Sequence, residues 1–195
     1  MVRVLKSVAA VAAFHVSLLG ACVAVAASVA PLSLDQIVAG AKHIVHVRCT
    51  GNIVQDDPDV GVVTITTFVV LDRARGGDEP TFTVRQVGGE LHGLAVDYHV
   101  PKFRAGDEYV LFMPAPSKLG LASPVGLSQG AFSVIPGTAG KEVGNGRDFG
   151  ELLAGTDAAS VPPRMAARLK RGGQERSRMD LEEFMALSRE KAGAR

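Results

Sequence analysis

Residues 44–71, with the sequence IVHVRCTGNIVQDDPDVGVVTITTFVVL, decide the fold class. Residues 44–54 and 62–71 are rich in valine, isoleucine, threonine and phenylalanine, which suit the pleated surface of a strand. The acidic cluster Asp56-Asp57-Pro58-Asp59 lies between these two runs, and aspartate with proline is typical of turns. The stretch therefore predicts two strands joined by a turn.

Further strands are predicted downstream of this pair. Residues 82–87 alternate in a strand-like pattern, residues 108–113 are apolar, and residues 130–135 and 141–143 flank a hairpin loop. No helical pattern separates these segments, which disfavours a parallel sheet with crossover helices. We expect a mainly β fold, namely a small, OB-like antiparallel barrel, closed or nearly closed, within residues 28–160.

A short helix is predicted at the start of the β domain. Ser33 is a helix-capping residue and Gln36 lies three positions later, which is the spacing of a capping box. Leu32 and Ile37 occupy the positions of the apolar contact that often accompanies such a box. The apolar spacing continues on one face until about Lys42, where we expect the helix to end.

The C-terminal part of the chain is predicted to be a linker followed by a helix. Residues 161–178 are basic and interrupted by glycine, and the proline pair at their start favours extended chain, so we expect a basic linker. Residues 179–195 are expected to form a C-terminal helix and tail, with Asp180 as the cap and Glu183 at the capping-box position. The apolar face of this helix would dock on the barrel.

Residues 1–27 have the layout of a secretory signal peptide. Arg3 and Lys6 precede a long, uncharged apolar run. Val25-Ala26-Ala27 fits the small-residue pattern that precedes a cleavage site, which places the predicted mature start at Ser28. We therefore expect a secreted or periplasmic protein.

A lipoprotein signal is the alternative interpretation of the same segment. Leu19-Gly20-Ala21-Cys22 resembles the motif in which the cysteine is acylated and becomes the first mature residue. The apolar residues 23–30 differ from the polar tether that usually follows such a cysteine. Contact with a membrane is expected only if Cys22 is lipidated.

The net charge argues against one class of partner, and the cysteine count argues against an internal disulfide. Loss of Arg3 and Lys6 from the 21 basic residues leaves 19 against 20 acidic residues, a net charge of −1. This balance provides no field that would attract nucleic acid, so we expect no nucleic-acid partner. After cleavage Cys49 is the only cysteine left, so an intramolecular disulfide is not expected.

The segment Gly126-Leu127-Ser128-Gln129-Gly130 matches the G-x-S-x-G pattern of serine hydrolases. That pattern needs a strand-to-helix turn and a histidine later in the chain. Here the residues that follow are strand-like, and all five histidines precede Ser128. We therefore interpret the segment as a glycine-rich turn before a strand and expect no catalytic residue in it.

His43, His46 and Cys49 carry side chains of the types that bind zinc. A spacing of three places side chains together on a helix but on opposite faces of a strand. Because this stretch is strand-like, the two imidazoles should diverge, and Cys49 fits a small core residue better than a ligand. No metal and no other cofactor is expected here.

Two loops are candidate contact sites for a partner, because loops often carry function. The first is a polar cluster formed by Glu90, His92, Asp97, Tyr98 and His99. The second is the acidic turn with Asp56, Asp57 and Asp59, which lacks the ordered spacing and the distal glutamate of a calcium loop. An alternative for the first cluster is a metal-dependent enzyme that uses its carboxylates and histidines.

Several short motifs occur in order between Leu32 and Val143. They are Leu32-Ser33-Leu34, residues 41–45, Thr64 through Arg75-Gly76, Gly88-Gly89, residues 101–113 and residues 125–134. In this order they resemble a group of secreted bacterial proteins of uncharacterised function. The resemblance implies a shared fold, because the motifs are structural rather than catalytic.

The same order of features also resembles the netrin-like module of tissue inhibitors of metalloproteinases. That resemblance implies an OB-type barrel and a protease as partner. Those inhibitors chelate the zinc of the protease through an N-terminal cysteine and are held by disulfides, whereas this chain has a predicted start at Ser28 and only Cys49. Binding by zinc chelation is therefore not implied for this chain.

Together these observations give a leading hypothesis and two alternatives. The leading hypothesis is a secreted or periplasmic, non-enzymatic binding protein whose partner is another protein, with an exported protease as the class that the resemblance implies. The alternatives are a metal-dependent envelope enzyme that uses the 90–99 loop and a structural envelope lipoprotein anchored through Cys22.

Overall fold

A long antiparallel hairpin dominates the computed structural model, which describes residues 30–193. Its strands are β1 (His43–Asp57) and β2 (Gly61–Arg75), with Cys49 opposite Phe68. The pairing register shifts at three places within residues 44–51 of β1, and such irregularities bend a strand and increase its twist. The two strands and the turn predicted from residues 44–71 are confirmed.

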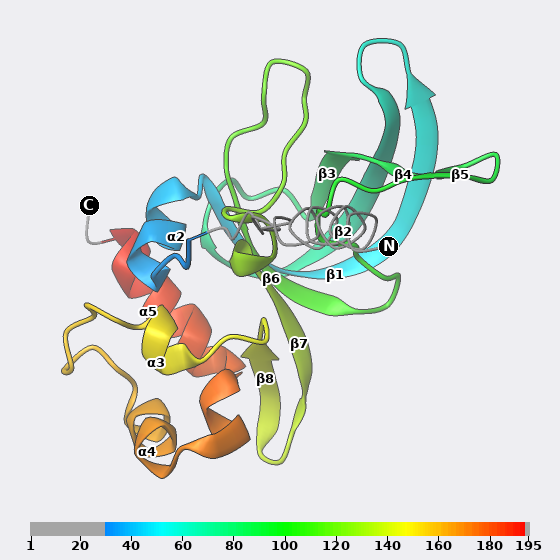
Figure 1. The fold of residues 1–195 in the computed structure, drawn as a ribbon. Coiled ribbons are helices and arrows are strands. Elements are labelled where there is room, and N and C mark those ends of the chain that lie inside the picture. The colour runs from blue at the N-terminus through cyan, green and yellow to red at the C-terminus, as the bar shows by residue number, and fades with distance from the viewer. Residues whose placement is uncertain (1–29, 194–195) are drawn as a thin grey trace, which may run out of the picture. The chain divides into compact units, whose positions relative to one another are not determined.

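A seven-stranded antiparallel sheet extends from this hairpin in the order β3-β2-β1-β6-β7-β8-β9 (Figure 1). The additional strands are β3 (Thr81–Val87), β6 (Glu108–Met113), β7 (Ala131–Gly137), β8 (Gly140–Gly144) and β9 (Met179–Asp180). A separate two-stranded hairpin consists of β4 (Gly89–Leu91) and β5 (Leu94–Val96). The mainly β, antiparallel prediction is confirmed.

The sheet does not close into a barrel within residues 30–193. Its two edges, β3 and β9, have no ladder between them. Beside β3 lies a loop, in which the Ala122 N–H donates to the Arg85 carbonyl at 2.9 Å, and β9 is only two residues long. Because no ladder joins the two edges, the OB-like barrel is not confirmed.

Both faces of the sheet are buried where β6 crosses its centre. Because successive side chains point to opposite faces, Phe112 joins Phe132 and the C-terminal helix α5 (Leu181–Gly193), whose Phe184 ring centroid lies 4.7 Å from that of Phe132. On the opposite face Tyr109 packs against Phe103, with ring centroids 5.1 Å apart. Figure 1 shows that α5 and the short helix α2 (Leu34–Gly40) cover the first face.

The predicted helix starts are confirmed. At α2 the Gln36 N–H donates to the Ser33 hydroxyl at 3.3 Å, and the Ser33 N–H donates to the Gln36 side chain at 2.8 Å, which completes the capping box. At α5 the Asp180 carboxylate accepts hydrogen bonds from the Glu182 and Glu183 N–H groups at 3.0 and 3.2 Å. Each helix therefore begins where its sequence places a cap.

Residues 161–178 contain helical structure where the sequence predicted a linker. They hold α4 (Pro163–Arg171) and a 3-10 helix (Gly173–Ser177), and Met165 is buried in the core. Another short helix, α3 (Phe149–Leu152), precedes them. The proline pair does not extend the chain, because Pro163 occupies the first helical turn, where its fixed φ and missing N–H are tolerated.

The basic side chains of this segment are largely paired. Arg168 bonds to Glu142 at 2.6 Å, Arg171 to Glu175 at 2.8 Å and Arg176 to Asp148 at 2.8 Å. By its internal contacts the chain divides into residues 1–30 and 31–195, so the predicted linker belongs to the same unit as the sheet. The positive charge of the predicted basic linker is thus partly neutralised by these ion pairs.

The predicted signal segment lies outside the described residues, together with Cys22 and the cleavage position before Ser28. No helix within residues 30–193 has the length and hydropathy needed to span a membrane.

Candidate functional site

The hairpin β4–β5 begins at the glycine pair that ends β3. Gly88 and Gly89 have φ values of 94° and 140°, which side chains rarely adopt. A Cβ atom on Gly89 would lie 2.7 Å from Val54 Cγ1 and from Thr64 Oγ1, so only glycine lets the chain cross β1 and β2 this closely. The glycine pair therefore places the hairpin over one face of the long β1–β2 ribbon.

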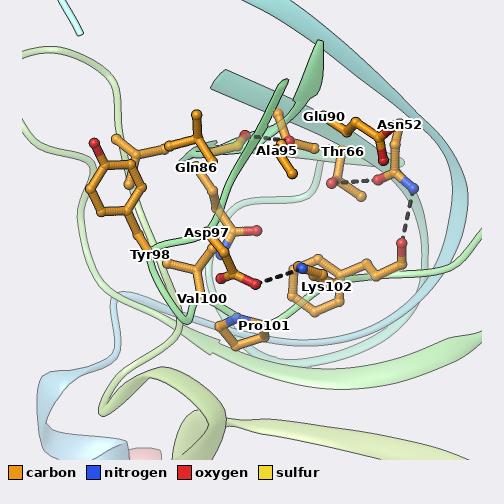
Figure 2. Close-up of a pocket in the computed structure, with 16 residues that line it drawn as sticks. Asn52, Thr66, Gln86, Glu90, Ala95, Asp97, Tyr98, Val100, Pro101 and Lys102 are labelled. Carbon is orange, nitrogen blue, oxygen red and sulfur yellow. Dashed lines mark hydrogen bonds and ion pairs between the residues drawn. The ribbon is translucent and has the colours of Figure 1, made fainter. Parts of the chain in front are cut away.

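A pocket of about 330 Å³ lies beneath this hairpin (Figure 2). Its floor carries Asn52 of β1, Thr66 of β2 and Gln86 of β3, and its opposite wall is formed by the hairpin and residues 96–103. Apolar side chains, among them Val100 of that segment, line much of the remainder. A small concave site with apolar walls and a few fixed polar groups is the usual form of a binding pocket.

Hydrogen bonds fix the polar floor. The Thr66 hydroxyl donates to Asn52 Oδ1 at 2.7 Å, and Asn52 Nδ2 donates to the Phe103 carbonyl at 2.9 Å, which ties the floor to the wall. Gln86 Nε2 donates to the Ser123 hydroxyl at 3.3 Å. Thr66 and Gln86 are only 1% and 3% exposed, so these side chains have little freedom to reorient.

Sequence reasoning missed these floor residues, although a signal for them exists. Thr66 and Gln86 lie at strand positions whose neighbours on the same face, Phe68 and Val84, are core residues. A polar side chain at an inward-facing position of a strand is informative, because buried polar groups need partners.

Three of the five predicted residues of the 90–99 loop line the pocket: Glu90, Asp97 and Tyr98. His92 lies at the hairpin turn with φ 51°, His99 has φ 58°, and neither lines the pocket. The structure therefore does not gather the carboxylates and histidines of this loop around one point. Leu94, which was not predicted, is 64% exposed, and Tyr98 is 58% exposed.

Asp97 is bound to its neighbours. Its carboxylate accepts a hydrogen bond from Lys102 Nζ at 2.8 Å and another from the His99 N–H at 2.7 Å. The bond from Lys102, followed by that from His99, lowers the pKa of Asp97 below its usual value. At neutral pH Asp97 and Lys102 therefore form a charge-balanced pair at the rim of the pocket.

The second candidate group forms the turn of the β1–β2 hairpin. Asp57 Oδ1 accepts hydrogen bonds from the Asp59 and Val60 N–H groups at 3.1 and 3.2 Å, and Oδ2 pairs with Arg85. Asp57 therefore stabilises the turn, while the side chains of Asp56 and Asp59 are exposed. None of the three lines the pocket beneath β4–β5.

The residues considered for a zinc site are separated. The His43 ring packs on Phe82 with ring centroids 5.4 Å apart, and burial, followed by the charge of Lys42, lowers the pKa of His43. His46 Nε2 lies 2.9 Å from Glu108 Oε2, and Cys49 is buried in the core on the other face. Within residues 30–193, histidine, cysteine, aspartate and glutamate form no group of three or more that could hold a metal ion.

Glu108 is the centre of a charged cluster on the sheet. Its carboxylate accepts hydrogen bonds from Arg48 at 2.8 Å and from Lys141 at 2.7 Å, in addition to the contact with His46. Burial alone raises the pKa of Glu108, but the hydrogen bonds from Lys141, Arg48 and His46 outweigh it and lower the pKa to about 2. The cluster links β1, β6 and β8 through one ionised carboxylate.

Glu108→Gln is expected to lower the free energy of unfolding by about 2 kcal/mol at pH 7, because a carboxylate with a lowered pKa stabilises the folded state when it is ionised. This stabilisation is fully present above the ordinary pKa of 4.5 and is lost as the pH falls toward 2. Urea unfolding of both proteins at pH 7 and pH 3 measures it. A difference that stays constant between the two pH values would contradict the assignment.

Ser128 lies in a 3-10 turn (Leu127–Gly130) followed directly by β7, as the sequence predicted. It borders a depression of about 300 Å³ whose described lining includes Tyr109 and Asn145 but no histidine. The adjacent Gln129 Oε1 accepts hydrogen bonds from the Leu32 N–H at 2.7 Å and from Arg147 at 2.9 Å. The segment thus holds the start of α2 against β7.

Comparison with models of protein families gives no match, and searches of curated proteins and of solved structures give none either. The function must therefore be argued from the pocket and its surroundings.

Proposed function

We propose that this chain is a secreted or periplasmic, non-enzymatic binding protein that contacts another protein through the β4–β5 hairpin and the pocket beneath it. The observation that carries the proposal is the combination of a preformed pocket with the exposed side chains of Leu94 and Tyr98 on its cover. A pocket gives shape specificity, and exposed apolar or aromatic side chains beside it supply contact area.

An exported protease is the partner class that we propose first. It is supported by the signal-like residues 1–27 and by the resemblance of residues 32–143 to the netrin-like module. We also propose an OB-like ancestry for the fold, supported by that resemblance and by the bends in β1, which curve the β1–β2 ribbon. Neither proposal requires an N-terminal cysteine.

The geometry favours binding over the alternative of a metal-dependent enzyme in the 90–99 loop. His92 and His99 do not line the pocket, and Asp97 is occupied by Lys102. A structural lipoprotein would depend on Cys22, which lies outside the described residues.

Leu94→Asp is expected to reduce capture of the partner at least tenfold, because a charge at the exposed tip opposes burial of the hairpin. The measurement is affinity capture from the periplasm or culture medium of the native host with tagged protein, quantified by mass spectrometry. Leu119→Asp is the matched control, because Leu119 is also exposed, at 48%, but lies outside the β4–β5 hairpin. Equal capture by the two variants would exclude the hairpin as the contact, and capture of no specific protein by the unmodified chain would count against the proposed function.

A further inference from the structure

The charged groups that line the pocket do not cancel. They are Glu90, Asp97 and Lys102, and Asp97 is paired with Lys102. Within the described part of the chain the side chain of Glu90 is exposed and has no hydrogen-bond or ion-pair partner, while its backbone pairs with that of Ala95 in the β4–β5 ladder. In Figure 2 Glu90 lies at the end of the pocket where Asn52 and Thr66 are found, away from Tyr98. The pocket therefore has one uncompensated negative charge, located at one end.

The rest of the lining suits a long side chain with an apolar stem. Val87, Val96 and Val100 contribute apolar wall, and Asn52 and Gln86 contribute amide groups held by hydrogen bonds. A basic side chain can place its methylene groups along such walls while its charged end reaches an acceptor. A carboxylate with two free oxygens matches the planar, forked donors of a guanidinium better than the single point charge of an ammonium.

We infer that the pocket beneath β4–β5 binds an arginine side chain of the partner polypeptide. The Glu90 carboxylate would accept hydrogen bonds from the guanidinium of that arginine. This inference rests on the proposed function for the identity of the ligand as a polypeptide. We therefore expect the partner segment to contain an arginine that binds at the Glu90 end of the pocket and an apolar residue that contacts Tyr98 and Leu94. Residues 28–160 contain 15 acidic and 10 basic residues, and this excess of negative charge would favour the approach of such a segment.

The test uses a small probe, so that it does not depend on finding the partner. N-acetyl-arginine methylamide is titrated into the ¹⁵N-labelled protein purified after export, and the backbone signals of Gly88 to Glu90 and the side-chain amide signal of Asn52 are followed by NMR. The neutral isostere N-acetyl-citrulline methylamide is titrated in parallel. The arginine probe should shift these signals with a Kd about tenfold lower than that of the citrulline probe, since partly exposed charged hydrogen bonds contribute on the order of 1.4 kcal/mol.

Glu90→Gln should abolish this preference for arginine, whereas Glu79→Gln, which removes an exposed carboxylate outside the pocket, should leave it unchanged. Raised salt should also weaken the arginine probe and not the citrulline probe. Equal binding of the two probes, absence of shifts at these signals, or an unchanged preference in Glu90→Gln would overturn the inference. If the protein binds the arginine probe but captures no partner, the inference of an arginine-binding pocket stands and the proposed function is refuted.

Discussion

Gly130→Ala is expected to cost about 3 kcal/mol of the free energy of unfolding, which is at the upper end for overpacking. A Cβ atom at this position would lie 2.5 Å from the Val125 carbonyl oxygen and 2.9 Å from the Val125 nitrogen. Both are backbone atoms and cannot rotate away. The turn would have to move off β6, which breaks the 2.9 Å hydrogen bond from the Val125 N–H to the Phe112 carbonyl.

The matched substitution is Gly51→Ala in β1. A Cβ atom on Gly51 would meet no other atom within 4 Å, and its φ is not positive, so this variant should be as stable as the unmodified protein or slightly more stable. Thermal unfolding followed by circular dichroism should place Gly130→Ala about 10 °C below Gly51→Ala. Equal melting temperatures of the two variants would mean that Gly130 does not lie this close to the Val125 backbone in solution.

This outcome also bears on the G-x-S-x-G pattern that the turn contains. In the structure the two glycines serve the turn: Gly126 has φ 62°, and Gly130 lies against Val125. The residue between them that matters for the fold is Gln129, which holds Leu32. Within residues 30–193 the Ser128 side chain makes no such contact, so the pattern marks a structural junction between α2 and β7.

The features predicted correctly from sequence are those that depend on neighbouring residues. Strand composition in residues 44–71 and the caps Ser33 and Asp180 act within a few positions, and each appears where it was predicted. The linker prediction failed for a local reason as well, because a proline favours both extended chain and the first turn of a helix. Only the burial of Met165 against the core distinguishes the two.

The features that sequence could not supply depend on which strands pair. Whether the sheet closes is decided by the two edges, β3 and β9, which are about 100 residues apart in the chain. The pocket floor likewise combines Asn52, Thr66 and Gln86 from three strands, and their convergence follows only from the register of β1, β2 and β3. The segment predicted as the 90–99 loop contains the β4–β5 hairpin; Glu90, Asp97 and Tyr98 line the pocket, whereas His92 and His99, which have positive φ values, do not.

Arg75 links both helices to the end of β2, so its loss should have an effect as large as that of Gly130→Ala. Its guanidinium donates to the Val38 and Ala41 carbonyls at the end of α2 and to the Ala192 carbonyl at the end of α5, each at 2.9 Å. Helix C-terminal carbonyls lack partners within the helix and carry partial negative charge. One cation therefore bonds to three helix-end carbonyls at once, although that of Val38 also accepts the Ala41 N–H at 3.3 Å.

Arg75→Met keeps most of the apolar stem and removes the charge and the donors, so we expect the free energy of unfolding to fall by about 3 kcal/mol. Arg75→Lys should recover only part of this, since one ammonium lacks the forked geometry that reaches both helix ends. Arg73→Met is the comparison, because Arg73 lies on the same strand and its side chain donates one hydrogen bond, to the Glu79 carbonyl at 2.7 Å. Urea unfolding followed at 222 nm should rank stability as Arg73→Met above Arg75→Lys above Arg75→Met. Equal stability of the two methionine variants would mean that the apolar core alone holds the helices. Arg75 would then have no structural role that explains its place in the motif from Thr64 to Gly76.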